Sequence, residues 1–173
     1  MAERFNIQLS ETDFYKLNSW AGSKEGGIAF PDYGQNTENG IVNITVLDAD
    51  VNAESRRSEV LSDFARLDIN SHLFLFPNDN AAGELEIALA EIAVDRKIIS
   101  CFEAYEKCIE GYEKPVNKSK IFAYLDAVLE PKYKKNNRKD LIQEQNRNYR
   151  NPAHWNLHHE YLNPLYSFLV PFF

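Results

Sequence analysis

"ITVLDADVNAESRRSEV", residues 44–60, places an apolar run directly before two aspartates, a polar turn and an amphipathic segment. The run "IVNITVL", residues 41–47, is rich in β-branched residues and free of charge, which predicts a strand buried on both faces. Residues 53–67 then place apolar side chains at helical spacing, which predicts a helix. The apolar positions are Val60, Leu61, Phe64 and Leu67.

A second strand and three more helices follow in the sequence. "HLFLF", residues 72–76, reads as a strand, and Pro77 ends it because proline has no N–H to donate to the sheet. After the turn "NDNAAG", residues 84–96, 98–109 and 118–129 have helical patterns. This order predicts an α/β fold with a central, mostly parallel sheet flanked by helices.

Further elements are predicted in the N-terminal and C-terminal parts of the chain. Residues 4–9 alternate like a strand, and residues 10–20 resemble a helix. Residues 21–40 hold five of the seven glycines and read as a loop, with room for a short strand at 27–30. Near the C-terminus, Tyr161, Leu165 and Phe168 fit the buried face of a final short helix. No linker or internal repeat is evident, so residues 1–173 are expected to form one domain.

Composition favours a reduced, cytoplasmic protein. The 173 residues are 44% apolar, yet no run approaches the roughly 20 apolar residues of a membrane span. The first residues lack the pattern of a signal peptide. Cys101 and Cys108 are seven positions apart in a predicted helix, about 10 Å along its axis and too far apart for a disulfide.

Charge is unevenly distributed, although the net charge is −7. Residues 130–151 carry seven basic and three acidic residues, interleaved with Tyr133 and Tyr149. This composition suits phosphate contacts and base stacking on nucleic acid, whereas the alternative is a solvated charged face. The candidate nucleic-acid-binding residues are Lys132, Lys134, Lys135, Arg138, Lys139, Arg147 and Arg150.

Acidic residues follow both predicted strands. Ligands in parallel α/β sheets gather beyond the carboxyl ends of the strands, where Asp48 and Asp50 end one strand. In extended geometry positions i and i+2 project from the same face, and two carboxylates suit Mg²⁺. Asp79 in the next loop, with Glu84 and Glu86, would extend the cluster. The alternative is turn chemistry, with the aspartates capping the following helix.

Two C-terminal features allow alternatives. His154 and His158 have the i, i+4 spacing of a metal site on a helix, but no Glu-x-x-His pattern or cysteine accompanies them, so structural histidines are favoured, His159 included. The closing "SFLVPFF", residues 167–173, is expected to pack on the core, or to cover the surface of a protein partner if it is exposed.

"ITVLDADVNAESR" resembles the third-strand motif of the Toprim domain, the metal-dependent fold of topoisomerases, primases, recombination proteins and nucleases related to the overcoming-lysogenization-defect proteins. "LFLFPNDNAAGELEIAL" and the terminal "W…YLNPLYSFL" are similar to small bacterial Toprim-related proteins of unknown function. The resemblance covers residues 41–173. It implies a sheet flanked by helices and an acidic Mg²⁺ (or Mn²⁺) site in which Asp48 and Asp50 match the metal-binding aspartate pair.

The resemblance also implies an N-terminal glutamate as general acid/base, and here the sequence departs from the pattern. Leu9 stands where that glutamate belongs, and Glu11 substitutes only if the loop is shifted; alternatively, residues 1–40 match the second strand–helix unit. The glycine after the aspartate pair is replaced by "VNAES". Two functions are therefore expected: magnesium-dependent phosphodiester hydrolysis or other phosphoryl transfer on nucleic acid, or a catalytically degenerate module that binds metal, nucleotide or a protein partner.

Overall fold

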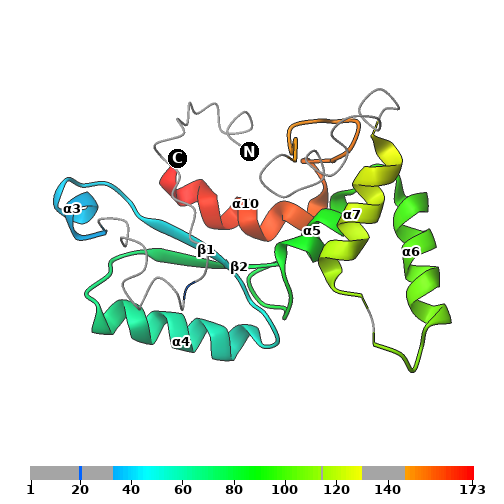
Figure 1. The fold of residues 1–173 in the computed structure, drawn as a ribbon. Coiled ribbons are helices and arrows are strands. Elements are labelled where there is room, and N and C mark those ends of the chain that lie inside the picture. Colours follow the sequence, from blue (N-terminus) through cyan, green and yellow to red (C-terminus); the bar gives the residue numbers. More distant parts are fainter. Residues whose placement is uncertain (1–19, 21–32, 114, 130–146) are drawn as a thin grey trace. The chain divides into compact units, whose positions relative to one another are not determined.

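A computed structural model describes residue 20 and residues 33–113, 115–129 and 147–173. Figure 1 draws the chain as a ribbon coloured along the sequence. The chain divides into two compact units, Met1–Gly83 with Pro164–Phe173, and Glu84–Asn163. The strands expected at 4–9 and 27–30, and the helix expected at 10–20 apart from Trp20, lie outside the described residues. The single-domain organisation stays a prediction.

The first unit contains a strand–helix–strand arrangement. Strand β1 (Ile44–Asp48) pairs in parallel with β2 (His72–Phe76), in a register that runs from Ile44 opposite His72 to Asp48 opposite Phe76. Helix α4 (Ala53–Arg66) connects the two strands. The predicted mixed α/β architecture with parallel strands is confirmed, although the sheet has only two strands within the described part of the chain.

Helix α4 packs through two of the four apolar positions that its spacing predicts. Val60 and Phe64 are buried in one cluster with Leu73 and Leu75 of β2, and Trp20 completes this core. The Trp20 indole N–H also donates to Asp63 Oδ2 at 2.9 Å, and its ring meets Phe64 edge to face. Leu61 and Leu67, in contrast, are exposed.

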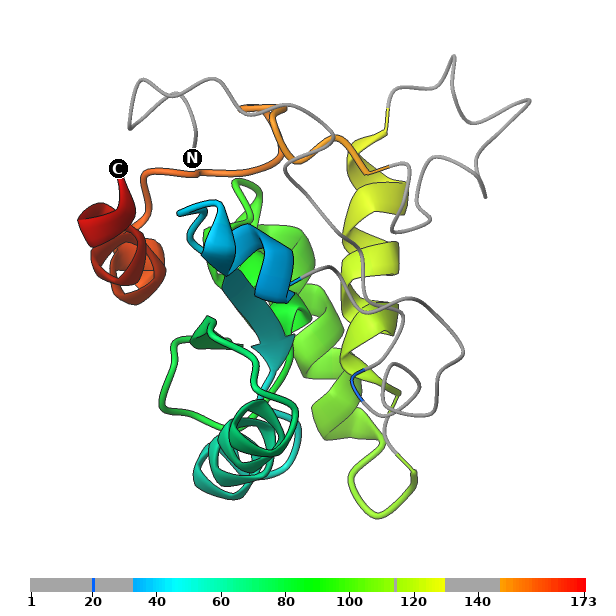
Figure 2. The same cartoon turned by 90° about the vertical axis from the view of Figure 1, so that its left-hand side faces the viewer.

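The C-terminal segment covers the other face of β2. Helix α10 (Asn163–Leu169) and a 3₁₀ turn, η4 (Val170–Phe172), end the chain. The Phe168 ring lies 5.4 Å from that of Phe74, and the Phe172 ring lies 4.5 Å from that of His72. Both views place α4 and α10 on different sides of the strands (Figures 1 and 2). Part of "SFLVPFF" therefore packs on the sheet, as expected.

Two local predictions for the first unit are wrong. Strand β1 is not buried on both faces, since Val46 is 40% exposed. Residues expected in a loop form helix α3 (Tyr33–Glu38), which lacks an apolar repeat. Long-range polar contacts hold it instead: the Asn43 amide donates to Tyr33 O, and the Tyr33 hydroxyl meets Thr45 Oγ1.

The second unit is helical in its described residues. It comprises α5 (Leu85–Ile92), α6 (Arg96–Cys108), α7 (Asn117–Val128) and the 3₁₀ turn η3 (Glu160–Leu162). Trp155 and Tyr124 lie at the centre of its core, with ring centroids 5.3 Å apart. Cys101 and Cys108 are free and exposed on α6. Within the described residues, none of the helices is apolar and long enough to serve as a membrane span.

Candidate metal centre

Asp48 and Asp50 lie where β1 ends, at the carboxyl edge of the strand pair. Asp48 is the last residue of β1 and pairs with Phe76, the last residue of β2. Asp50 follows the strand with a φ of 55°, in the left-handed region that Asp tolerates better than most residues. The extended geometry expected across this pair therefore stops at Asp48, and the i, i+2 argument for a shared face does not apply to Asp50.

The Asp50 carboxylate is accessible. Its side chain is 55% exposed, and its Oδ2 lies 3.6 Å from Arg56 Nε, beyond hydrogen-bond distance. Arg56 instead makes its close contact with Glu59 Oε2, at 3.0 Å. A depression of about 190 Å³ opens beside Asp50, lined in part by Asn52, Ser55, Arg56 and Glu59. An ion pair this long, with a largely exposed carboxylate, contributes little to the free energy of folding. A divalent cation can therefore compete with Arg56 for the Asp50 carboxylate.

Asn52, rather than either aspartate, caps helix α4. Its backbone is extended and its Oδ1 accepts a hydrogen bond from Ser55 N at 2.8 Å. The alternative in which either aspartate is the N-cap of the helix is thus wrong, because Asn52 occupies that position. The alternative of turn chemistry is not contradicted, and the positive φ of Asp50 fits it.

We expect Asn52→Ala to lower the free energy of unfolding by about 1 kcal/mol, because Ser55 N–H loses its acceptor. Urea unfolding followed by circular dichroism measures this loss. Asn52→Asp keeps an acceptor at the same position and is the matched control. An Asn52→Ala midpoint equal to that of wild type would assign the cap to another residue.

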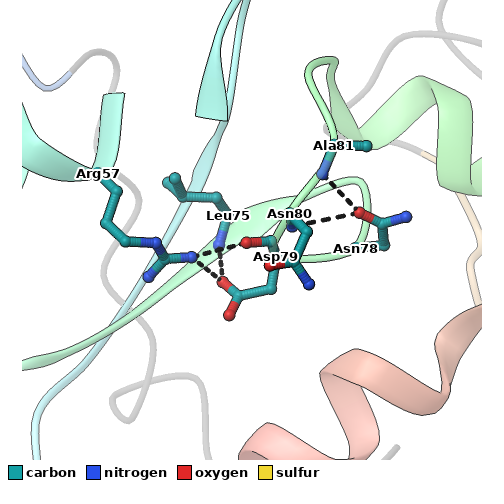
Figure 3. A network of polar contacts seen from close by, with 6 residues as sticks. All are labelled: Arg57, Leu75, Asn78, Asp79, Asn80 and Ala81. Atoms are coloured by element: carbon teal, nitrogen blue, oxygen red, sulfur yellow. Dashed lines mark hydrogen bonds and ion pairs between the residues drawn. The ribbon is translucent and has the colours of Figure 1, made fainter. Parts of the chain in front are cut away.

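Asp79, in the loop after β2, is engaged with an arginine (Figure 3). Arg57 Nη2 donates to Asp79 Oδ1 at 2.6 Å and to Asp79 O at 2.8 Å. The same Oδ1 accepts the Leu75 N–H at 3.0 Å. These contacts use the carboxylate to hold the loop and leave it poorly suited to the role of metal ligand.

Glu84 and Glu86 belong to the second unit, whereas the aspartates belong to the first. Glu84 precedes α5 at its N-cap position without a side-chain capping bond. Glu86 is buried, and its Oε1 lies 3.6 Å from Nη1 of Arg147, whose side chain is fully buried. The guanidinium of Arg147 also lies over the Phe122 ring, 5.3 Å from its centroid. Glu86 therefore neutralises an internal arginine.

The same contacts bear on the predicted nucleic-acid surface. Arg147 faces the interior of its unit and does not present its guanidinium to solvent, whereas Arg150 is exposed. The remaining predicted contacts, and Glu11 as the predicted acid/base, lie outside the described residues. The acid/base role of Glu11 therefore stays a prediction. So do the nucleic-acid contacts of Lys132, Lys134, Lys135, Arg138 and Lys139.

His154 and His158 lie in turns of the second unit, and His159 precedes the 3₁₀ turn η3, so none of the three lies on a helix. The side-chain amide nitrogen of Asn151 lies 3.3 Å from the ring nitrogens of His154. His159 Nδ1 accepts a hydrogen bond from Tyr161 N at 3.2 Å. The helical i, i+4 geometry of His154 and His158 is therefore absent. The carbonyl oxygen of His154 accepts hydrogen bonds from Val94 N and the Tyr124 hydroxyl, which fits a structural role.

Burial lowers the pKa of His154 below its ordinary value of 6.5. The unfolded state then binds more protons than the folded state once the pH falls below about 6.5, so this contribution to stability is present above that pH and lost as the pH falls. We expect an NMR titration of the His154 ring to give a midpoint below 6.5. A midpoint at or above that value would contradict the burial of the ring.

Within the described residues, no group of three or more His, Cys, Asp or Glu side chains is placed to share a metal ion. Mg²⁺ has modest requirements, since it keeps several waters and often takes only one or two carboxylates together with substrate phosphate oxygens. The exposed Asp50 carboxylate, two residues after the end of β1 at Asp48, is one accessible oxygen donor of this kind. The described residues therefore offer no cage of several side chains, and any ion bound at this edge would have to keep most of its waters.

Comparisons with known proteins found no match to this chain among family models, curated proteins or solved structures.

Proposed function

We propose that the first unit is Toprim-like and that Asp48 and Asp50 bind Mg²⁺ or Mn²⁺ for phosphodiester hydrolysis, or a related phosphoryl transfer, on nucleic acid. The observation that carries this proposal is the accessible carboxylate of Asp50, which follows the end of β1 at Asp48, at the carboxyl edge of a parallel strand pair. That edge is where α/β folds of this kind bind ligands. The N-cap position of α4, one alternative role for the aspartates, is occupied by Asn52.

Each group of the chain has a defined task in this proposal. Asp48 and Asp50 hold the cation, and the depression beside Asp50 receives the phosphate. When bound, the metal supplies a Lewis acid that polarises the phosphate and lowers the pKa of an attacking water. The basic residues of 132–150 other than Arg147 dock the polyanion through phosphate contacts. Glu11 serves as the general acid/base only if the N-terminal loop is shifted, because the resemblance places Leu9 at the position of the family's glutamate.

A second candidate is a non-catalytic module that binds metal, nucleotide or a protein partner. It is favoured by the engagement of two predicted acidic ligands with arginines, Asp79 with Arg57 and Glu86 with Arg147. A third protein-derived ligand is then missing from the described residues. The exposed Val170 and Phe173 at the chain end provide apolar surface for a partner.

Titration calorimetry with Mg²⁺ and with Mn²⁺ tests the metal site shared by both candidates. We expect wild type to bind one ion and Asp48→Asn and Asp50→Asn to lose most of the affinity, because an amide oxygen lacks the carboxylate charge. Asp68→Asn is the matched control, since Asp68 is exposed and has a φ of 54°, close to that of Asp50. Wild type that releases no binding heat would remove the first candidate and the metal-binding form of the second.

A further inference from the structure

The two loops at the carboxyl edge of the strands are joined to each other by main-chain hydrogen bonds. Asp50 N donates to Gly83 O at 3.0 Å, and Gly83 N donates to Asp50 O at 2.6 Å. This isolated bridge ties Asp50 to the far end of the loop that leaves β2. The backbone position of Asp50 therefore depends on how that loop is held.

The near end of the loop is held by Arg57, from the second turn of α4. Its Nη2 contacts both the carboxylate and the carbonyl oxygen of Asp79, and Asp79 N in turn donates to Leu75 O at 2.6 Å. Asn78 Oδ1 stiffens the turn by accepting the N–H groups of Asn80 and Ala81 (Figure 3). Helix α4, the loop and Asp50 thus form one connected chain of contacts.

We propose that Arg57 and Asp79 are a positioning pair for the metal site. Arg57 fixes residues 78–83 against α4, and the Gly83 bridge passes that constraint to Asp50. The effect of this pair on metal binding rests on the proposed function, whereas the mechanical link between Arg57 and Asp50 does not. In this assignment Asp79 contacts Arg57 and not the cation, which replaces the ligand role that the sequence suggests for it.

The direction in which Arg57→Gln changes metal affinity distinguishes a positioning role from two alternatives, a purely electrostatic role of Arg57 and a ligand role of Asp79. If Arg57 acted only through its charge, Arg57→Gln would tighten binding of a nearby cation, because a like charge is removed. If Asp79 were a ligand, Arg57→Gln would free it and also tighten binding. Positioning predicts the reverse, a loss of about tenfold in affinity, as is typical when a partner that orients a ligand is removed.

The experiment measures two quantities on the full chain: Mn²⁺ affinity by electron paramagnetic resonance, and NMR-detected amide exchange at Asp50 and Gly83. The variants are Arg57→Gln, Asp79→Asn and their combination. We expect faster exchange at both amides and about tenfold weaker Mn²⁺ binding in each variant, with the double variant no worse than either single one. Arg66→Gln is the matched control, because it breaks another arginine–aspartate pair at the far end of α4.

The outcomes are separable. Tighter Mn²⁺ binding in Arg57→Gln, or unchanged exchange at Asp50 and Gly83, would overturn the positioning role. Absence of Mn²⁺ binding in wild type would overturn the proposed function, while faster exchange at Asp50 in Arg57→Gln would still support the mechanical link. Unchanged exchange at Phe74, inside β2, checks that each variant keeps its fold.

Discussion

Arg147→Met should lower the free energy of unfolding of the second unit by roughly 3–5 kcal/mol, the usual effect of leaving one buried charge without its partner. The carboxylate of Glu86 is only 3% exposed and would remain in the interior without its arginine. Urea unfolding monitored by Trp155 fluorescence in a Trp20→Phe background measures the loss, since Trp155 belongs to the core of the same unit.

Arg150→Met is the matched control, because it makes the same chemical change three positions away at an exposed side chain. Its effect should stay within about 0.5 kcal/mol. The double variant Glu86→Met/Arg147→Met should lose much less stability than Arg147→Met alone, because no buried charge is left unpaired. If Arg147→Met kept wild-type stability and lost affinity for single-stranded DNA, Arg147 would return to the nucleic-acid surface.

Asp48→Asn and Asp50→Asn should each reduce metal-dependent cleavage of single-stranded nucleic acid by roughly 10²–10³-fold, about 3–4 kcal/mol of transition-state stabilisation. The replacement keeps the size of each side chain and removes the charge that holds the cation. Asparagine also tolerates the left-handed backbone of Asp50, so the loop keeps its conformation. Initial rates with Mg²⁺ or Mn²⁺, on DNA and RNA oligonucleotides, measure the effect.

Asp68→Asn should cleave at the wild-type rate, since Asp68 lies at the other end of α4. Cleavage that persists in Asp48→Asn, or in the presence of a chelator, would contradict the proposed mechanism. Wild type that binds Mn²⁺ but leaves every oligonucleotide intact would favour the non-catalytic binding module.

The elements that local periodicity determines are the ones that the sequence predicts well. The apolar spacing of residues 53–67 gives α4 to within one residue, and Pro77 marks the end of β2. Helix α3 escapes prediction because its stability comes from Asn43 and Thr45, beyond its own sequence. Local pattern carries no information about such tertiary contacts.

In the candidate site, too, the sequence predicts the features that local pattern determines and misses those that depend on tertiary contacts. That Asp48 ends a strand is readable from the apolar run before it. The left-handed backbone of Asp50 and the engagement of Asp79 are not, because they depend on Gly83 and Arg57. The pairing of Glu86 with Arg147 joins residues far apart in the chain. The sequence does not distinguish an arginine that pairs with a buried carboxylate, such as Arg147, from one that is exposed on the surface.

Anomalous diffraction from crystals soaked with Mn²⁺ tests the metal site most directly. We expect one strong anomalous peak at the carboxyl edge of the strands, within coordination distance of Asp48 and Asp50. A peak bound elsewhere on the chain, or none at an Mn²⁺ concentration that saturates the protein in solution, would contradict it.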